Sequence, residues 1–153
     1  MDGQAAFHYV SCGLRNIWLR NGFEISQTPY GEAVAIHNLK GLHKAIGLDL
    51  VRNKPRLTGG EVRFLRKEMD LPQAQLAKML AVSENTIRAW ENDRQAITGP
   101  AERILRQLFL EYANERSELR ELIDRISQLN RDRHETEKRL EFLETEGQWQ
   151  AAA

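Results

Sequence analysis

The chain has 153 residues, of which 41% are hydrophobic and 29% are charged, and its 22 basic residues balance its 22 acidic residues. This length allows one domain or two small ones. No stretch approaches the ~20 apolar residues of a membrane-spanning helix, and the first residues lack the basic and apolar regions of a secretory signal. The single cysteine, Cys12, excludes an internal disulfide. We therefore expect a cytoplasmic protein.

The first part of the chain predicts a small β-rich domain. Asn21-Gly22 is typical of a two-residue hairpin turn and predicts that the segments on either side of it pair with each other. Pro29-Tyr30-Gly31 predicts a second turn. The predicted strands are residues 7–10, 17–20, 23–26 and 33–36.

A helix is predicted to close this first domain. Leu42, Ile46 and Leu50 recur at spacings of four between residues 41 and 51. The sequence RNKPR that follows, at residues 52–56, contains a proline and is predicted to be a linker. We place the first domain at residues 1–56.

Residues 57–113 predict an all-α domain. Thr58 and Glu61 have the spacing of a capping box and predict the start of its first helix, with Phe64 facing the core. That helix is expected to end, and the next to begin, around Met69–Pro72. A further helix is predicted from residue 100, with an apolar face that consists of Ile104, Leu105, Leu108, Phe109 and Tyr112.

Residues 73–91, QAQLAKMLAVSENTIRAWE, predict two short helices joined by a tight turn. In the first helix Leu76, Ala77 and Leu80 recur at helical spacing. Ala81-Val82 is predicted to form the turn, with Val82 filling the angle between the helices. Two helices joined in this way form a helix-turn-helix.

The second helix of the pair has two faces of different character. Ser83 is suited to cap it, and Ile87 and Trp90 are predicted to be buried. The opposite face is left with Glu84, Asn85, Arg88 and Ala89. A short helix that presents polar side chains at its N-terminal end fits the major groove of DNA. The pattern therefore predicts double-stranded DNA as a partner.

These residues resemble the Cro and phage-repressor helix-turn-helix family, also called the XRE family. The resemblance covers about residues 57–112 and is carried by Gln73, Leu76-Ala77, Val82-Ser83, Thr86-Ile87 and Trp90-Glu91-Asn92. It implies four or five helices around one small core. Ala81 and Asp93 stand where the family usually has glycine. Asp tolerates a left-handed backbone, whereas Ala81 is expected to stay near the right-handed region.

The resemblance and the side-chain chemistry together predict which residues contact bases. In the family, the residues just after the cap of the recognition helix contact bases, and they correspond to Glu84 and Asn85. Asn85 can bond an adenine edge, and Arg88 can bond guanine. Glu84 can accept a hydrogen bond from cytosine, or it can equally stabilise the positive N-terminal end of its own helix.

Phosphate contacts are expected from residues around the same motif. The family's first motif helix begins with a glutamine that holds a phosphate, which corresponds to Gln73. Basic side chains nearby are further candidates or solvated helix faces: Arg63, Arg66, Lys67, Lys78, Arg88 and Arg94. Thr86 is expected to contact either a phosphate or a thymine methyl group. Residues 99–153 carry nine basic and twelve acidic residues, so this acidic arm is expected to point away from DNA.

Residues 114–153 predict a long charged helix over positions 115–144. Its apolar residues alternate three and four apart as in a coiled coil: Leu119, Leu122, Ile126 and Leu129. The helix is interpreted as a dimerisation arm; alternatively it folds back on its own subunit, or breaks near residues 131–135. Residues from Gly147 are expected to be frayed. A homodimer would bind an inverted repeat with half-sites ~10 bp apart, and the resemblance implies repression.

The N-terminal domain has some resemblance to MqsA-type antitoxins, through Cys12-Gly13-Leu14, Trp18-Leu19 and Asn21-Gly22. In that group a zinc-bound N-terminal domain binds a toxin and the C-terminal domain represses the operon. This chain lacks their paired Cys-x-x-Cys motifs, so no cofactor is expected. The alternative is a zinc site made of His8, Cys12, His37 and His43. Otherwise Cys12 is a small core residue.

The sequence thus predicts an α+β protein without enzymatic activity, because it contains no phosphate-binding loop, nucleophile elbow or HExxH motif. The leading hypothesis is a dimeric DNA-binding transcriptional repressor. One alternative is an antitoxin that binds a toxin through residues 1–56 and also represses its operon. Another is a protein-binding scaffold whose helix-turn-helix no longer meets DNA.

Overall fold

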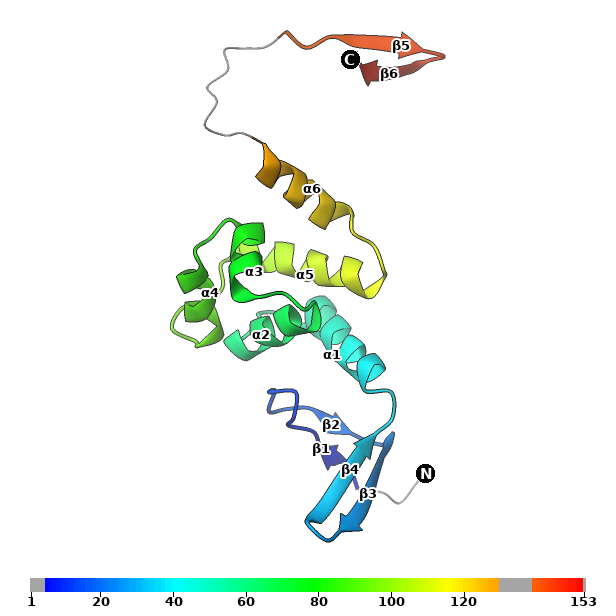
Figure 1. Cartoon of the computed structure of the whole chain (residues 1–153), viewed down its shortest axis with the longest axis vertical. Coiled ribbons are helices and arrows are strands. Elements are labelled where there is room, and N and C mark those ends of the chain that lie inside the picture. Colours follow the sequence, from blue (N-terminus) through cyan, green and yellow to red (C-terminus); the bar gives the residue numbers. More distant parts are fainter. Residues whose placement is uncertain (1–4, 130–138, 153) are drawn as a thin grey trace.

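The computed structural model describes residues 5–129 and 139–152 (Figure 1). Its strands are β1 (Phe7–His8), β2 (Trp18–Leu19), β3 (Phe23–Thr28), β4 (Gly31–Ile36), β5 (Phe142–Thr145) and β6 (Gln148–Ala151). Its helices are α1 (Leu39–Asn53), α2 (Gly59–Glu68), α3 (Gln73–Leu80), α4 (Glu84–Glu91), α5 (Gly99–Ala113) and α6 (Glu118–Gln128). This mixture confirms the predicted α+β class. Within the two described ranges, no helix is long and apolar enough to cross a membrane.

The N-terminal strands form two separate two-stranded sheets. β1 pairs with β2, which places Phe7 opposite Leu19, and β3 pairs with β4 through the predicted turn at Pro29-Tyr30. The hairpin predicted at Asn21-Gly22 is therefore wrong, because β2 and β3 belong to different sheets. Gly22 does adopt a positive φ of 79°. Its carbonyl accepts the backbone N–H of His37 (2.8 Å), and the chain passes there from one sheet to the other.

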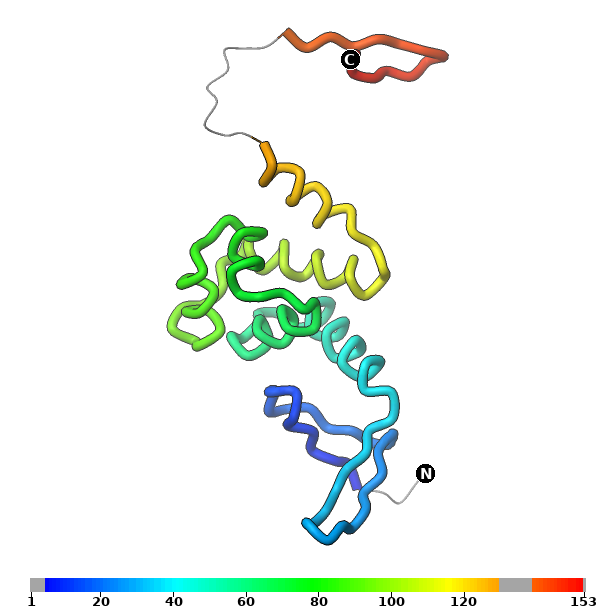
Figure 2. Tube along the Cα trace, viewed as in Figure 1, coloured from blue at the N-terminus to red at the C-terminus, as the bar shows by residue number. Residues whose placement is uncertain are grey.

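Helix α1 connects the N-terminal strands β1 to β4 to the helices that follow, as the Cα trace shows (Figure 2). It buries Ile46 and Leu50 as predicted and packs against α5. Gly47 lies so close to α5 that a Cβ atom there would stand 2.1 Å from the ring of Phe109. Arg52-Asn53 belongs to the helix, so the predicted linker is reduced to residues 54–56.

Helices α2 to α5 supply the centre of the hydrophobic core. The predicted capping box begins α2, because the Thr58 hydroxyl accepts the N–H of Glu61 (3.2 Å) and the Glu61 carboxylate accepts the N–H of Thr58 (2.8 Å). The largest fully buried side chains are Val62, Leu65, Leu76, Ile87, Trp90, Leu105 and Phe109. The same core extends to the N-terminal strands through Tyr9, Leu14, Leu19 and Phe23.

Helix α6 is shorter than the helix predicted over positions 115–144. It ends at Gln128 and packs against α5 and α3, with Leu119 and Ile123 half-buried against the core. Residues 118–128 of the predicted arm therefore fold back on their own subunit, and Leu122 and Leu129 remain exposed. The predicted break near residues 131–135 lies outside the described residues.

Residues 142–151 contradict the predictions of a helix and of a frayed end. β5 and β6 form an antiparallel hairpin that turns at Glu146-Gly147, where both residues have positive φ (53° and 79°). Positive φ at both central residues is the pattern of a type I′ turn, which joins hairpin strands and which glycine favours. Phe142 and Trp149 prefer extended structure, and these local preferences outweigh the helical spacing of Leu140 and Leu143.

Candidate nucleic-acid interface

The turn between α3 and α4 fixes the angle of the two helices. Val82 donates its backbone N–H to the Ala77 carbonyl (3.0 Å) and is half-buried against the core, as predicted. Ala81 has φ 56° and ψ 42°, which places it in the left-handed region. The expectation of a right-handed Ala81 is therefore wrong: the α3 C-terminus ends in a left-handed cap, a position that glycine usually occupies.

Helix α4 is divided into a buried and a polar face. The Ser83 hydroxyl caps it by accepting the N–H of Thr86 (3.1 Å). Ile87 and Trp90 are 0% and 1% exposed, so the predicted core face is confirmed. Glu84, Asn85, Arg88 and Ala89 lie on the other side, half-buried or exposed. The core thus holds α4 rigidly and leaves its N-terminal polar side chains accessible.

The three polar side chains of this face are bonded to one another. Arg88 donates to the Glu84 carboxylate (Nη2–Oε1 2.8 Å) and to the Asn85 amide oxygen. All three lie at the surface, where such an ion pair contributes only ~0–1 kcal/mol. The polar side chains of this face therefore bond to one another, and DNA could replace these bonds at a small cost in free energy.

Behind this face lies a buried polar network. Arg66 forms a bidentate pair with Glu91 (2.7 and 2.9 Å) and donates to the Leu71 carbonyl (2.9 Å). Gln73 donates its amide N–H to the same Glu91 carboxylate (3.2 Å). Arg66 is thus not a surface cation available for phosphate, and this alternative from the sequence is wrong. The network ties the end of α2, the start of α3 and the end of α4 together.

Comparison with known proteins agrees with this geometry. Residues 62–101 match the family model described as helix-turn-helix, a range that begins in α2, contains α3 and α4 and ends at the start of α5. This segment is a helix-turn-helix of the Cro and phage-repressor type. No curated protein and no solved structure is significantly similar to the chain. The match covers only these residues, and it supports a role in DNA-binding regulation.

The predicted phosphate-binding residues lie at several places around the helix-turn-helix. Gln73 is half-buried at the start of α3, and the Thr86 hydroxyl is bonded to that of Ser83 (2.8 Å). Arg94 is exposed just after α4. Lys78 is exposed on α3 and lines a cavity of about 500 Å³ between α3 and α6. Their roles toward DNA stay predictions.

Asp93 connects the end of α4 to the start of α2. It adopts a left-handed backbone (φ 58°), in agreement with the expectation that Asp tolerates this conformation. Its carboxylate also accepts the backbone N–H of Gly59 (3.0 Å). A Cβ atom on Gly59 would stand 2.2 Å from the Trp90 carbonyl, so glycine is required for this close approach.

The four alternative zinc ligands are engaged with different partners. His8 stacks on Trp18 (4.2 Å between ring centroids), and His37 lies 3.6 Å from the Glu24 carboxylate. Cys12 is a half-buried free thiol packed against the core. Among the residues that the structure describes, no group of three or more His, Cys, Asp or Glu side chains is arranged to hold a metal.

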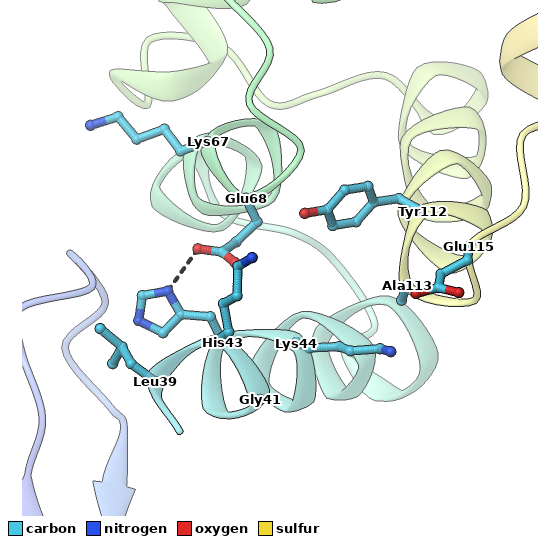
Figure 3. A pocket seen from close by; sticks show the side chains of 10 residues that line it. Leu39, Gly41, His43, Lys44, Lys67, Glu68, Tyr112, Ala113 and Glu115 are labelled. Atoms are coloured by element: carbon cyan, nitrogen blue, oxygen red, sulfur yellow. Dashed lines mark hydrogen bonds and ion pairs between the residues drawn. The ribbon is translucent and has the colours of Figure 1, made fainter. Parts of the chain in front are cut away.

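His43 takes part in a relay that the sequence did not predict. Its Nε2 contacts the hydroxyl of Tyr9, which follows β1 (2.7 Å). Its Nδ1 contacts the Glu68 carboxylate of α2 (2.7 Å), beside a cavity of about 570 Å³ (Figure 3). Burial of Tyr9, with smaller effects from Cys12 and Glu68, raises the pKa of the phenol above its usual 10.0. The relay links the segment after β1 to α1 and α2.

Proposed function

We propose that the protein is a homodimeric transcriptional repressor that binds an inverted repeat in double-stranded DNA through α4. The observation that supports this most is the rigid placement of α4, with Ile87 and Trp90 buried and Asn85 and Arg88 exposed. A recognition helix enters the major groove with such a face and reads a few base pairs at its N-terminal end. Two copies on half-sites ~10 bp apart would read a palindrome.

Asn85 and Arg88 are proposed to read bases after exchanging partners. In the free protein Arg88 is bonded to Glu84 and Asn85. These exposed contacts contribute ~0–1 kcal/mol, whereas a bidentate contact to the correct base contributes ~1–3 kcal/mol. Guanine therefore competes well for the Arg88 guanidinium. When Arg88 turns to guanine, the Asn85 amide loses this bond and is free to bond adenine. Glu84 either keeps the guanidinium oriented or accepts from cytosine.

The remaining contacts are proposed to position the protein on the phosphate backbone. Gln73 stands at the N-terminal end of α3, where backbone N–H groups favour an anion. Thr86 lies in the first turn of α4, while Arg94 follows its last turn and Lys78 lies on α3. Contacts of this kind carry no sequence information, and each phosphate met by a cation adds ~0.9 to the slope of log affinity against log salt.

A footprint across the DNA upstream of the protein's own gene is the first test, followed by quantitative binding. Asn85→Ala and Arg88→Ala should each weaken binding to the footprinted site by ~1–3 kcal/mol, while binding to an unrelated duplex stays unchanged. Arg94→Ala should weaken both and lower the salt slope by ~1. Lys40→Ala, on an exposed lysine of α1, is the matched control and should change neither.

Two outcomes would contradict the proposal at different points. If Asn85→Ala and Arg88→Ala leave the sequence preference unchanged, α4 does not read bases. If the wild-type protein raises transcription from the footprinted promoter in a purified system, the protein is not a repressor there.

A second function is supported by the N-terminal strands, namely that of an antitoxin whose residues 1–56 bind a protein toxin. Ile25 and Val34 lie opposite each other on β3 and β4, next to the Phe23–Ile36 pair. Phe23 is buried, but Ile25 and Val34 are 48% and 37% exposed. The apolar face thus continues beyond the core and is uncovered in the described residues, as a protein-binding surface would be.

Co-expression with the product of the neighbouring gene tests this second function. A stable complex that Ile25→Lys abolishes, while Glu32→Lys on the same hairpin does not, would support it. Failure of the two proteins to co-purify, or a complex indifferent to Ile25→Lys, would contradict it. DNA binding by the helix-turn-helix is measured separately and does not depend on this result.

A further inference from the structure

The C-terminal hairpin has no core of its own. Every residue of β5 and β6 is exposed, and the Phe142 and Trp149 side chains are 59% and 70% exposed. A two-stranded sheet alone is at best marginally stable in water and needs more strands or a covering apolar layer. The described residues of this chain supply neither, so the hairpin is an incomplete sheet.

One face of the hairpin is mainly apolar. Phe142 lies opposite Ala151, and Glu144 lies opposite Trp149. Directly opposed residues of an antiparallel pair project to the same face. Two aromatic rings and a methyl group therefore share one face, with a single carboxylate among them.

The backbone groups of the same residues point outward. Ala152 donates its N–H to the Glu141 carbonyl (2.8 Å), which identifies the positions that are hydrogen-bonded within the hairpin. Hydrogen-bonded and non-hydrogen-bonded pairs alternate along an antiparallel pair of strands. Counting from the Glu141–Ala152 pair, the next hydrogen-bonded pair inside the hairpin is Leu143–Gln150, and the pairs at Phe142–Ala151 and Glu144–Trp149 are not hydrogen-bonded there. The N–H and C=O groups of Trp149 and Ala151 are left at the open edge of β6.

Charge distinguishes the two edges of the hairpin. Glu144 lies in β5, Glu141 precedes it, and Arg139 pairs with Glu141. β6, with the sequence QWQA, contains no charged residue. Charged side chains protect an edge strand from pairing with another strand, whereas an uncharged strand remains open to it. The open edge is therefore β6.

We propose that β6 pairs antiparallel with β6 of a second copy of this chain, around a two-fold axis at Gln150. In this register Trp149 lies opposite the partner subunit's Ala151, so that a large side chain meets a small one. The outward N–H and C=O groups of both residues find partners in both copies. The resulting four-stranded sheet is isologous and closes a two-fold dimer.

This inference rests on the proposed dimeric repressor and assigns the surface that makes it a dimer. In this proposal the contact between the two copies is a sheet of β6 strands and not the predicted coiled coil. A two-fold axis at Gln150 is also the symmetry that an inverted repeat requires.

Charge substitution at Gln150 tests the axis. In the proposed register this residue meets its own copy at a non-hydrogen-bonded position, where side chains are closest. Sedimentation of the full chain without DNA, over a range of concentrations, should show a dimer for the wild type. Gln150→Lys and Gln150→Glu should each raise the dimer dissociation constant roughly three- to tenfold, because like charges directly opposite repel. An equimolar mixture of the two should restore wild-type affinity.

Two further variants separate edge pairing from general damage. Ala151→Pro removes an outward N–H but no hydrogen bond inside the hairpin, and should raise the dissociation constant about tenfold or more. Gln148→Lys lies on the same strand and face but away from the axis, and should leave the dimer unchanged.

Two outcomes would overturn the proposed interface. The first is a wild-type chain that stays monomeric at every concentration; the second is a dimer that Gln150→Lys, Gln150→Glu and Ala151→Pro leave intact. Because these measurements contain no DNA, they are independent of base reading. If Asn85→Ala and Arg88→Ala do not change base reading but the Gln150 variants weaken the dimer as expected, only the DNA proposal is contradicted.

Discussion

The helix-turn-helix body and the C-terminal hairpin use their tryptophans in opposite ways. Trp90 in α4 is 1% exposed, and Trp149 in β6 is 70% exposed. In the body, polar groups are also internally satisfied, as in the Arg66–Glu91 pair, while the hairpin has open edges. The body is therefore a complete folding unit, whereas the hairpin needs additional structure to become one.

Substitution of the two tryptophans should affect stability very differently. Trp90→Ala should lower the free energy of unfolding by ~3–5 kcal/mol, because it removes a fully buried aromatic side chain and leaves a cavity. Trp149→Ala should change it by less than ~0.5 kcal/mol when unfolding is followed by the helical signal at low protein concentration. Urea denaturation monitored by circular dichroism measures both. Equal effects of the two substitutions would show that the two regions do not differ in this way.

The buried ion pair gives the next largest effect. Arg66→Ala should destabilise the protein by ~3 kcal/mol, because Glu91 is left buried without its charge partner. The double variant Arg66→Met, Glu91→Leu removes both charges and should recover much of this loss. The same urea titrations test both variants. A loss below ~1 kcal/mol for Arg66→Ala would mean that Glu91 finds water or another donor at little cost.

Local signals in the sequence predicted the body well. The Thr58–Glu61 capping box, the Ser83 cap and the Ile87–Trp90 stripe each depend on residues within a few positions of one another, and all three are present. Such motifs are reliable because backbone geometry alone brings their members together. The base-contacting roles of the residues on α4 depend on DNA, and stay predictions.

Long-range pairing could not be predicted in the same way. Asn21-Gly22 favours a turn, but which strand pairs with β2 depends on competition with β1, whose residues lie 10 and 12 positions before their partners in β2. The Tyr9–His43–Glu68 relay joins residues 34 and 25 positions apart, and no local pattern records it. The same is true of the Arg66–Glu91 pair, whose arginine looked like a surface cation.

The relay itself predicts a dependence on pH. Burial raises the pKa of Tyr9 above 10.0, so the folded protein favours the neutral phenol. Its contribution to stability is therefore complete below pH 10.0 and is lost as the pH rises through the folded-state value. Tyr9→Phe should remove this alkaline loss and, at neutral pH, cost ~1 kcal/mol for the hydrogen bond to His43.

Urea titrations between about pH 8 and 11 measure the slope of stability against pH. Tyr30→Phe is the control, because Tyr30 is exposed and should leave the slope unchanged. A wild-type slope that persists in Tyr9→Phe would assign the alkaline loss to other groups.

The smallest effect concerns the two non-glycine residues with a left-handed backbone that flank α4. Ala81 has φ 56° and is exposed, so Ala81→Gly should stabilise the protein by ~0.5 kcal/mol. Relief of ~1–2 kcal/mol of strain exceeds the ~0.4–1 kcal/mol of entropy that glycine adds to the unfolded chain. Asp93 has almost the same backbone, φ 58°, but its carboxylate accepts the N–H of Gly59 (3.0 Å). Asp93→Gly should therefore destabilise by ~1 kcal/mol, and thermal unfolding of the two variants should shift in opposite directions. A rise in the unfolding temperature of both variants would show that backbone strain, and not the side-chain hydrogen bond, decides both positions.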